Sequence, residues 1–302
     1  MVNNLEIIHK AKRIVDTLDT NYFDLTVLNE RTDIDISIVM TTYNRSVQTY
    51  FTLKTIANSS CKNVQVIIVD DSTTDTLNMD TLQGYGVCTY HIKTKNKFWF
   101  NPCVNYNLGF KFIKGSKVII QNAEVCHVGD VISYVDKELK ENDYLVFDVA
   151  TTPNLEINGL LHQMEMTFDN YANISSLFNG WYQHHITYNR CLHFLSAITK
   201  KTFDKINGFD YDFSMGSWYD DNEFLFRIKA VGINVIAVPL DKQIQGIHQW
   251  HPISGYDWDK GMIKNDGLID AKVTYFHKHA KLFYSTDYPL DEAYDKLIEL
   301  FA

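Results

Sequence analysis

The sequence lacks the features of a membrane protein, a secreted protein or a nucleic-acid-binding protein. No apolar run in its 302 residues approaches the length that a helix needs to cross a bilayer. Its first residues, Met1-Val2-Asn3-Asn4, lack the basic and apolar regions of a signal peptide. The net charge of −9 opposes binding to nucleic acid, because that affinity comes from Lys and Arg neutralising phosphates. We therefore expect a soluble protein with no membrane span and no nucleic-acid partner.

Cysteines are few, and no pair of them is spaced as Cys-x-x-Cys. An odd number in this pattern reads as free thiols in a reducing compartment. The tripeptide Asn44-Arg45-Ser46 fits a glycosylation acceptor, but it lies in a loop expected to bind ligand, where a glycan would block the site. We expect a cytoplasmic protein, in the host cytoplasm if the Asn-, Lys- and Ile-rich chain is viral. The five cysteines are Cys61, Cys88, Cys103, Cys126 and Cys191.

Repeats, low-complexity segments and proline-rich linkers are absent too, so one continuous domain is the simplest organisation. Periodic apolar residues over 5–18 predict a helix in an N-terminal helical extension, 1–34. A first half, 35–150, and a second half, 151–256, follow, and 257–302 is expected to be a C-terminal helical segment.

The first half alternates apolar strands with helices. Such alternation predicts an α/β fold in which a Rossmann-like, mostly parallel sheet is flanked by helices. The second half is looser: 151–190 has no clear period and is expected to fold over the site. A helix over 220–231 and a strand over 235–238 restore regularity. The strands predicted in the first half are 36–41, 64–69, 87–92, 117–121 and 144–149, and the helices are 46–58, 102–112 and 129–141.

Two of the predicted strands stop abruptly at polar loops. Strand 36–41 runs into Thr41-Thr42-Tyr43-Asn44-Arg45, and strand 64–69 runs into Asp70-Asp71-Ser72. In open α/β sheets the ligand lies beyond the carboxyl ends of the strands. We therefore expect these two loops to form two walls of one polar ligand site.

Five motifs in this order resemble the family-2 glycosyltransferases of the GT-A fold, from about residue 35 to about 252. The resemblance implies transfer of a sugar from a nucleotide-sugar donor, a UDP-sugar by default, to a hydroxyl acceptor such as a glycan. Gly208–Gly232 also resembles the C-terminal half of galactosyltransferase-type GT-A enzymes. The motifs are Thr-Thr-Tyr-Asn-Arg, Val-Asp-Asp-Ser, Asn107-Leu108-Gly109, Gln121-Asn122-Ala123-Glu124-Val125, and Gly208-Phe209-Asp210 with Trp218-Tyr219-Asp220-Asp221.

The resemblance also implies which residues hold the nucleotide. Asp70 matches the family carboxylate that contacts the base, with Asp71 in the same turn, and Asn107 matches the asparagine that faces the donor. Arg45 could reach a phosphate, which suits a planar guanidinium, although such a residue also occurs at exposed helix starts. The expected nucleotide-binding residues are Thr41, Tyr43, Arg45, Asp70, Asp71, Asn107 and Asn122.

Glu124 stands where the family usually has the last carboxylate of Asp-x-Asp, which coordinates a divalent cation. Here the triplet is Asn122-Ala123-Glu124. One carboxylate with diphosphate oxygens and waters is an ordinary site for Mg²⁺ or Mn²⁺, and a histidine would favour Mn²⁺. Either His248 or His251 fits that place, and each could equally be packed or solvated beside Trp250.

Asp221 is the expected catalytic base. In the family an acid at a helix start deprotonates the acceptor hydroxyl, which displaces the nucleoside diphosphate in one step and inverts the anomeric centre. Asp220 and Trp218 are expected to contact the acceptor. Acids at a helix start also favour the helix dipole without any catalytic role.

Three other functions remain to be weighed. A noncatalytic GT-A-like module that binds nucleotide-sugars or glycans would share the fold without the chemistry. A sugar nucleotidyltransferase would normally have a glycine-rich loop after its first strand, but residues 40–46 contain no glycine. A glycoside hydrolase needs two carboxylates at a set separation, and no such pair can be placed from the sequence.

Overall fold

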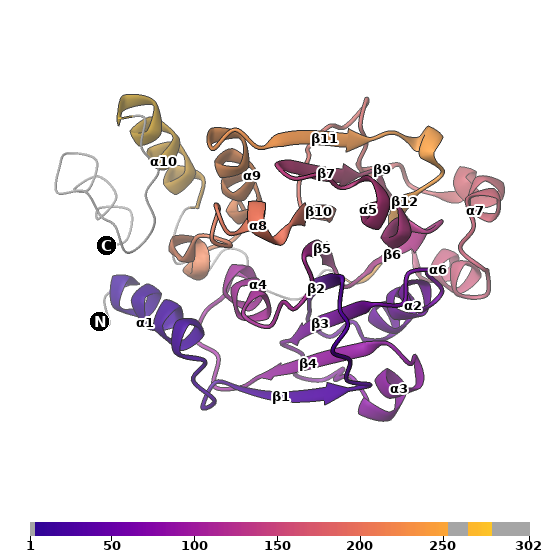
Figure 1. The fold of residues 1–302 in the computed structure, drawn as a ribbon, viewed down its shortest axis with the longest axis horizontal. Helices are drawn as coiled ribbons and strands as arrows, with labels where there is room; N and C mark the ends of the chain where they lie inside the picture. The colour runs from indigo at the N-terminus through magenta and orange to yellow at the C-terminus, as the bar shows by residue number, and fades with distance from the viewer. Residues whose placement is uncertain (1–3, 253–264, 280–302) are drawn as a thin grey trace.

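A computed structural model describes residues 4–252 and 265–279. Its centre is an eight-stranded sheet in which the strands lie in the order β1-β4-β3-β2-β5-β10-β7-β11 (Figure 1). The strands are β1 (Phe23–Leu28), β2 (Ile36–Thr42), β3 (Val64–Asp70), β4 (Cys88–Thr94), β5 (Lys117–Asn122), β7 (Asp143–Phe147), β10 (Leu195–Thr199) and β11 (Asn234–Val238).

Four neighbouring strands, β4, β3, β2 and β5, are parallel and form the middle of this sheet. Their apolar residues, such as Ile38, Val66 and Ile119, are fully buried, as expected where helices cover both faces. The predicted α/β fold is therefore confirmed. The sheet is mostly parallel, as predicted, with β10 running antiparallel between β5 and β7. Between β7 and β10 the chain passes through β8, α6, α7 and β9, and it then re-enters the large sheet in the direction opposite to β7.

A second, four-stranded sheet was not predicted. It has the order β6-β12-β8-β9, and its strands are only three or four residues long. Strands this short carry little periodic signal in the sequence. They are β6 (Val125–Val128), β8 (Val149–Thr151), β9 (Trp181–Gln183) and β12 (Gln245–His248).

Helices flank the large sheet on both sides. In Figure 1, α1, α4, α9 and α10 lie on one side, and α2, α5, α6 and α7 lie on the other. The helices are α1 (Asn4–Thr17), α2 (Ser46–Ala57), α3 (Met79–Gly84), α4 (Cys103–Phe110), α5 (Val131–Glu138), α6 (Leu155–His162), α7 (Phe168–Ile174), α8 (Lys200–Phe203), α9 (Asp220–Ala230) and α10 (Asn265–His279), with short 3₁₀ turns at Ser175–Leu177, Tyr211–Met215 and Leu240–Lys242.

Gly109 sets how closely α4 approaches the parallel strands. A Cβ on this residue would lie 2.8 Å from Cγ1 of Val39 and 3.2 Å from Cγ2 of Val69, which is closer than carbon atoms can pack. The glycine of the Asn-Leu-Gly motif therefore serves helix–sheet packing.

The two ends of the chain differ from expectation in detail. The segment 1–34 contains the predicted helix, α1, but also β1, which pairs antiparallel with β4 at the edge of the large sheet. Within the predicted C-terminal segment 257–302, residues 265–279 form α10, and the others lie outside the described residues. In α10 the buried Lys272 pairs with Asp210 and Asp212, at 2.6 Å from each.

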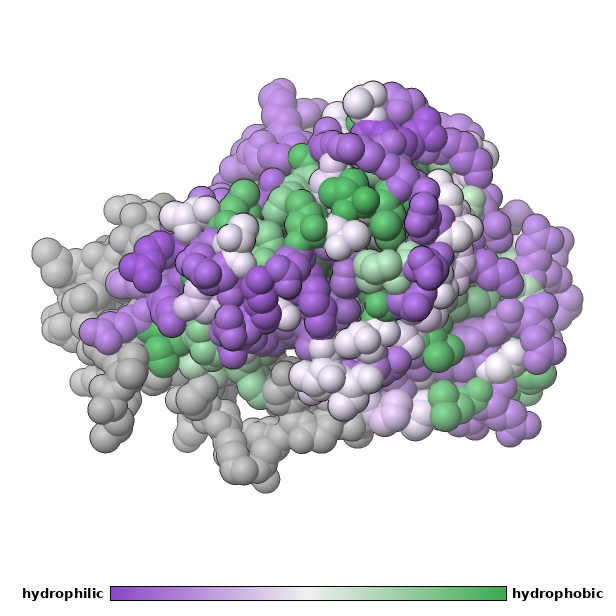
Figure 2. Space-filling model, turned by 90° about the horizontal axis from the view of Figure 1, so that it is seen from below, coloured by the Kyte–Doolittle hydropathy of each residue, from purple (hydrophilic) through white to green (hydrophobic). Residues whose placement is uncertain are grey.

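The surface is mainly hydrophilic on the face seen from below in Figure 2, with hydrophobic residues gathered in the middle of that face. Among the large hydrophobic side chains, Leu25 of the edge strand β1 is 40% exposed. No helix in the described part of the chain is long and apolar enough to cross a membrane.

Candidate active site

A cleft of about 450 Å³ opens at the carboxyl ends of β2 and β5 and is closed on the other side by residues of the second half. Ten of the residues predicted for the site line this cleft together, from segments up to 210 positions apart in the sequence. Asp70, Asn107 and His248 do not line it. The predicted residues that do are Thr41, Tyr43, Arg45, Asp71, Asn122, Glu124, Trp218, Asp220, Asp221 and His251.

The cleft contains a cluster of potential metal ligands around Glu124. The Nε2 atoms of His248 and His251 lie 3.3 Å and 3.6 Å from Oε1 of Glu124, so the structure brings both candidate histidines to the same carboxylate. Strand pairing explains this: β12 lies antiparallel to β6 with His248 opposite Val125. The backbone of Gln249 then donates to the carbonyl of Glu124 at 3.0 Å.

The ligand set fits a divalent cation. Oε2 of Glu124 is buried and has no hydrogen-bond partner among the described residues, which is costly unless a ligand takes it. Burial by itself would raise the pKa of Glu124, but the charge of Arg45 and hydrogen bonds from His248 and His251 hold it well below its usual value. One anionic oxygen ligand with two imidazoles suits Mn²⁺ better than the harder Mg²⁺.

Arg45 contacts Glu124 directly. Its Nη1 donates to Oε1 at 2.6 Å across 79 positions of sequence. The residue lies at the start of α2, where Thr49 fixes its carbonyl through a backbone hydrogen bond of 2.9 Å and a side-chain bond of 2.8 Å. The guanidinium therefore lies at the cluster of potential metal ligands rather than in open solvent.

The two aspartates at the carboxyl end of β3 have different surroundings. Asp70 is fully buried, and its carboxylate contacts Nε2 of His91 at 3.0 Å and Nζ of Lys93 at 3.4 Å. Burial would raise the pKa of Asp70, but His91, Ser72 and Lys93 lower it. Asp70 is not among the residues that line the cleft, and its contact with a base stays a prediction.

Asp71 lines the cleft in place of Asp70. It pairs with Lys97 and accepts a hydrogen bond of 2.6 Å from Oγ1 of Thr94. Asp70 is the last residue of β3 and Asp71 follows it, and of the two only Asp71 lines the cleft. Lys97 also lines the cleft, although it was not among the predicted site residues.

Asn107 faces the protein interior rather than a donor. Its side chain accepts a hydrogen bond of 2.8 Å from the backbone N–H of Phe209 and donates one of 2.7 Å to the Phe209 carbonyl. Gly208, with φ +79°, allows this approach, because a Cβ there would lie 2.4 Å from Oδ1 of Asn107. The family-like asparagine and the Gly-Phe-Asp turn therefore hold α4 and the second half together.

The acidic pair lies at the first turn of α9. The two residues before it, Trp218 and Tyr219, have φ of +63° and +65°, a conformation that costs energy for large side chains and is concentrated at functional sites. Trp218 is 65% exposed at the cleft. This turn directs both aspartates into the cleft.

The surroundings of the pair raise both pKa values. Burial, and then the charge of Asp221, raise the pKa of Asp220 to about 7, although Asn101 donates a hydrogen bond to it at 3.0 Å. Burial also raises the pKa of Asp221, against an opposing hydrogen bond from Asn222 and the charge of Arg190. One of the two carboxyl groups can thus hold a proton near neutral pH.

Several residues of the cleft were not predicted. Of the segment 151–190, which was expected to fold over the site, Tyr182 lines the cleft, and His193 and Phe194 join it from beyond that segment. Tyr182 stacks on His248 with ring centroids 4.2 Å apart. His193 is buried against Tyr106 and Phe209, and burial lowers its pKa to about 3, which keeps it neutral. The many aromatic residues of this segment were the available signal in the sequence. Because their spacing follows no period, the sequence did not predict where they lie relative to the cleft.

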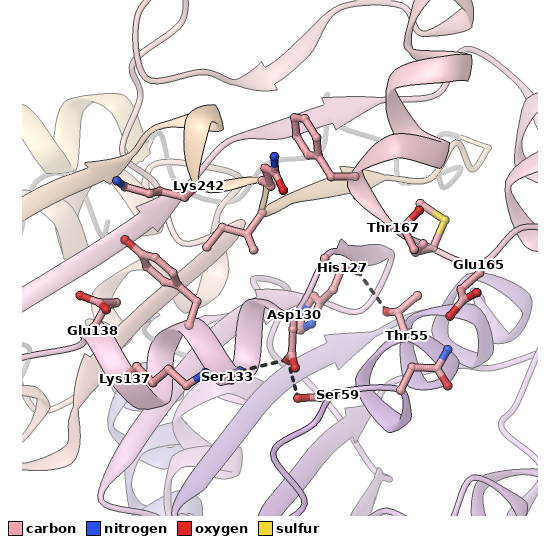
Figure 3. Close-up of a pocket in the computed structure, with 17 residues that line it drawn as sticks. Thr55, Ser59, His127, Asp130, Ser133, Lys137, Glu138, Glu165, Thr167 and Lys242 are labelled. Carbon is pink, nitrogen blue, oxygen red and sulfur yellow. Dashed lines mark hydrogen bonds between the residues drawn. The ribbon is translucent and has the colours of Figure 1, made fainter.

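A second cleft, of about 520 Å³, lies between α2, α5 and the turns before α7 and β12 (Figure 3). Its acidic group Asp130 is engaged by hydroxyls of Ser59 and Ser60, both at 2.6 Å, and caps α5 through Ser133. Burial lowers the pKa of His127 to about 4, and its Nε2 bonds to Gln121 at 2.8 Å. These groups have structural partners, so the cleft offers no evident reactive set.

Asp148, His184 and His185 form another cluster with metal-ligand chemistry. Nδ1 of His185 donates to Asp148 at 2.6 Å. Nδ1 of His184 accepts the backbone N–H groups of Ile186 and Thr187 at 3.1 Å and 3.2 Å. The neutral ring must then carry its proton on Nε2, the atom that faces Asp148, so His184 is not free to bind a metal there.

Comparisons with known proteins give one family and one fold. The model of Glycosyl transferase family 2 matches residues 37–206, more than half of the chain, and a model described as the N-terminal domain of galactosyltransferase matches 176–251. No curated protein matches the chain.

Similar solved structures include three of TarS from S. aureus. The fragment 1–349 in complex with UDP-GlcNAc has a TM-score of 0.57 and 13% identity, covering 83% of this chain and 68% of that chain. The same fragment with UDP has a TM-score of 0.53 and 13% identity, covering 81% and 72%. A further TarS structure has a TM-score of 0.52 and 12% identity, and the match covers 82% of this chain but only 44% of that one. At such identities the likeness shows a shared fold.

Proposed function

Because this chain belongs to glycosyl transferase family 2 and has the GT-A fold, we propose that it transfers a sugar from a nucleotide-sugar, a UDP-sugar by preference, to a hydroxyl acceptor such as a glycan. The proposed mechanism is a single displacement that inverts the anomeric centre, with Asp221 as the general base. The observation that carries the proposal is the convergence of Arg45, Asp71, Glu124 and Asp221 on one cleft.

The proposed donor end lies at the ends of β2, β3 and β5. Asp71 would accept a hydrogen bond from the base, with Tyr43 and the backbone of Thr41 beside it, and Asn122 would bond to ribose or sugar hydroxyls. Arg45 would bind the diphosphate, for which a planar guanidinium with several N–H donors is suited.

The proposed metal centre uses Glu124, His248 and His251. A cation bound there would neutralise the charge that develops on the leaving diphosphate. Support comes from the buried unpartnered Oε2 of Glu124 and from the two Nε2 atoms beside Oε1.

At the acceptor end, Asp221 would take the proton of the attacking hydroxyl as its oxygen bonds to the anomeric carbon. The bond from that carbon to the diphosphate oxygen breaks in the same step. Asp220 would orient either the acceptor or the carboxylate of Asp221. The exposed Trp218 offers its ring face to the acceptor sugar. General-base assistance of this kind is worth about 10²–10⁴-fold in rate.

The state of the cysteines bears on the compartment in which this reaction takes place. The five cysteines are free thiols in the structure, which supports our expectation of a cytoplasmic protein, or of the host cytoplasm for a viral one. The divalent cation and the UDP-sugar are the ligands we propose.

A thermal-shift panel tests the proposal. Nucleoside diphosphates and their sugars are added with and without Mn²⁺, and UDP with Mn²⁺ is expected to stabilise most, by about 2.7 kcal/mol when the ligand is at 100 times its Kd. Glu124→Ala should abolish the metal-dependent part of that stabilisation, because it removes the anionic ligand.

Glu138→Ala is the matched control, because Glu138 is an exposed acid outside this cleft; its metal response should equal that of the wild type. Equal stabilisation of wild type and Glu124→Ala by Mn²⁺ would contradict the metal centre. Binding of a UDP-sugar without any release of UDP over a panel of acceptors would indicate a noncatalytic module instead.

A further inference from the structure

Oε1 of Glu124 is shared by three cationic or potentially cationic groups. Nη1 of Arg45 lies 2.6 Å from it, closer than Nε2 of either His248 at 3.3 Å or His251 at 3.6 Å. At this distance the guanidinium of Arg45 occupies the space next to Oε1, where a metal ion would have to bind. A divalent cation on the same atom would lie a few ångströms from a like charge, in a buried place where such repulsion is strong.

The side chain of Arg45 can leave this position without disturbing the fold. Its backbone carbonyl is held by Thr49, whereas in the described part of the chain its guanidinium makes a hydrogen bond or ion pair with Glu124 alone. The side chain is 22% exposed and lines the cleft, while that of Glu124 is 3% exposed. The mobile partner of this pair is therefore the arginine.

We propose, on the footing of the proposed function, that Arg45 is a displaceable counter-ion of the metal centre. It holds Glu124 when no donor is bound, and moves to the diphosphate when nucleotide and cation arrive, which frees Oε1 for the cation. The bidentate geometry of a guanidinium suits both a carboxylate and a phosphate. Cation and nucleotide binding are then coupled through one side chain, and by linkage each ligand raises the affinity of the other by the same factor.

The sign of the effect on metal affinity tests this role. Mn²⁺ binding to the full chain is measured by electron paramagnetic resonance of the free ion, with and without UDP, for the wild type and Arg45→Met. Without UDP, Arg45→Met should bind Mn²⁺ about tenfold more tightly, the size expected for removal of one competing charge-assisted hydrogen bond. With Mn²⁺ present, its affinity for UDP should be about tenfold weaker, because the diphosphate loses the same partner.

Lys97→Met is the matched control. Lys97 lines the same cleft and carries the same charge, but it pairs with Asp71 rather than with Glu124. Its loss should change Mn²⁺ affinity in the absence of UDP by less than about threefold, since only a longer-range charge is removed. Arg45→Gln should behave as Arg45→Met does, and it replaces that variant if the apolar side chain prevents folding.

Two results overturn the inference. Unchanged Mn²⁺ affinity in both Arg45 variants would leave Arg45 as a phosphate ligand only, and weakened affinity would mean that it orients Glu124 for the metal. Either result leaves the proposed function intact if UDP still binds the wild type. Failure of the wild type to bind UDP with Mn²⁺ would instead overturn both.

Discussion

The carboxylates at the two ends of the cleft have opposite electrostatic surroundings. At the strand ends, Glu124, which lines the cleft, and Asp70, which does not, are buried beside cationic partners, and the pKa of each is lowered in spite of burial. At the start of α9, Asp220 and Asp221 are also buried, but no lysine or arginine in the described residues forms an ion pair with them, and the pKa of each is raised.

This difference separates binding from proton transfer. A carboxylate whose pKa is held low stays anionic at every relevant pH, so it can hold a cation or a neighbouring side chain but is a poor proton acceptor. A carboxyl group whose pKa lies closer to neutral can accept a proton during reaction. Burial raises the pKa at both ends, so the deciding factor is whether a cationic side chain forms an ion pair with the carboxylate.

The largest expected effect is at the acceptor end. Asp221→Asn keeps the shape of the side chain but cannot accept a proton, so the transfer rate should fall by at least about 10²-fold while donor affinity is nearly unchanged. In the wild type the rate should rise with pH as the acidic pair loses its proton, and the variant should lose that dependence. Steady-state kinetics and UDP titrations measure both quantities.

Asp220→Asn is the internal comparison for this prediction. Its effect on rate should be smaller, since Asp220 is proposed to orient rather than to accept the proton. If Asp220→Asn is inactive and Asp221→Asn active, the base is the earlier residue. A product with the anomeric configuration of the donor would exclude a single displacement altogether.

The second expected effect is on stability. An aspartate titrates near 3.9 in an unfolded chain and Asp220 near 7 in the fold. Between these values the folded state binds more protons, so the wild type loses stability as pH rises from about 4 to about 7. Asp220→Asn removes this cost while its amide oxygen can still accept from Asn101, and at pH 8 it should be the more stable protein by at most about 4 kcal/mol.

Urea unfolding of the ligand-free protein at pH 4 and pH 8 measures this difference. At pH 4 the two proteins should be nearly equal, because the carboxyl group is then protonated in the fold. Glu138→Gln, a change of an exposed acid, controls for the loss of one negative charge. An Asp220→Asn protein less stable than the wild type at pH 8 would mean that the ionised carboxylate has a stabilising partner.

The smallest expected effects concern the two aspartates at the carboxyl end of β3. Asp70→Asn removes a buried charge from His91 and Lys93 and should cost about 2 kcal/mol of stability at neutral pH. That cost should shrink as pH falls, because a carboxylate with a lowered pKa contributes its stability only while it is ionised. Asp71→Asn should instead leave stability nearly unchanged and weaken UDP binding about tenfold, or about 1.4 kcal/mol.

Urea unfolding and UDP titration on the same two proteins separate these roles. Weaker UDP binding by Asp70→Asn, with unchanged stability, would return the base contact to Asp70. It would also show that the strand end is arranged differently in the presence of nucleotide.

Local patterns in the sequence determined much of the fold. The β-branched runs at 36–41, 64–69 and 117–121 predicted the buried parallel strands, because a strand covered on both faces needs apolar residues at every position. Polar residues at their ends predicted the place of the cleft. The edge strand β1 and the short strand β12 were missed, since they are defined by pairing with distant partners rather than by their own period.

The candidate site depended more on tertiary structure. The sequence by itself identified Glu124, Asp220 and Asp221, and left His248 and His251 as alternatives that strand pairing brings to one carboxylate. It could not determine which of Asp70 and Asp71 faces the cleft, that Asn107 bonds to the Phe209 backbone, or that Arg45 contacts Glu124 79 positions away. Composition and period determine which segments are buried. The direction and the partner of a single polar side chain depend on backbone geometry and long-range packing, and only the folded chain decides them.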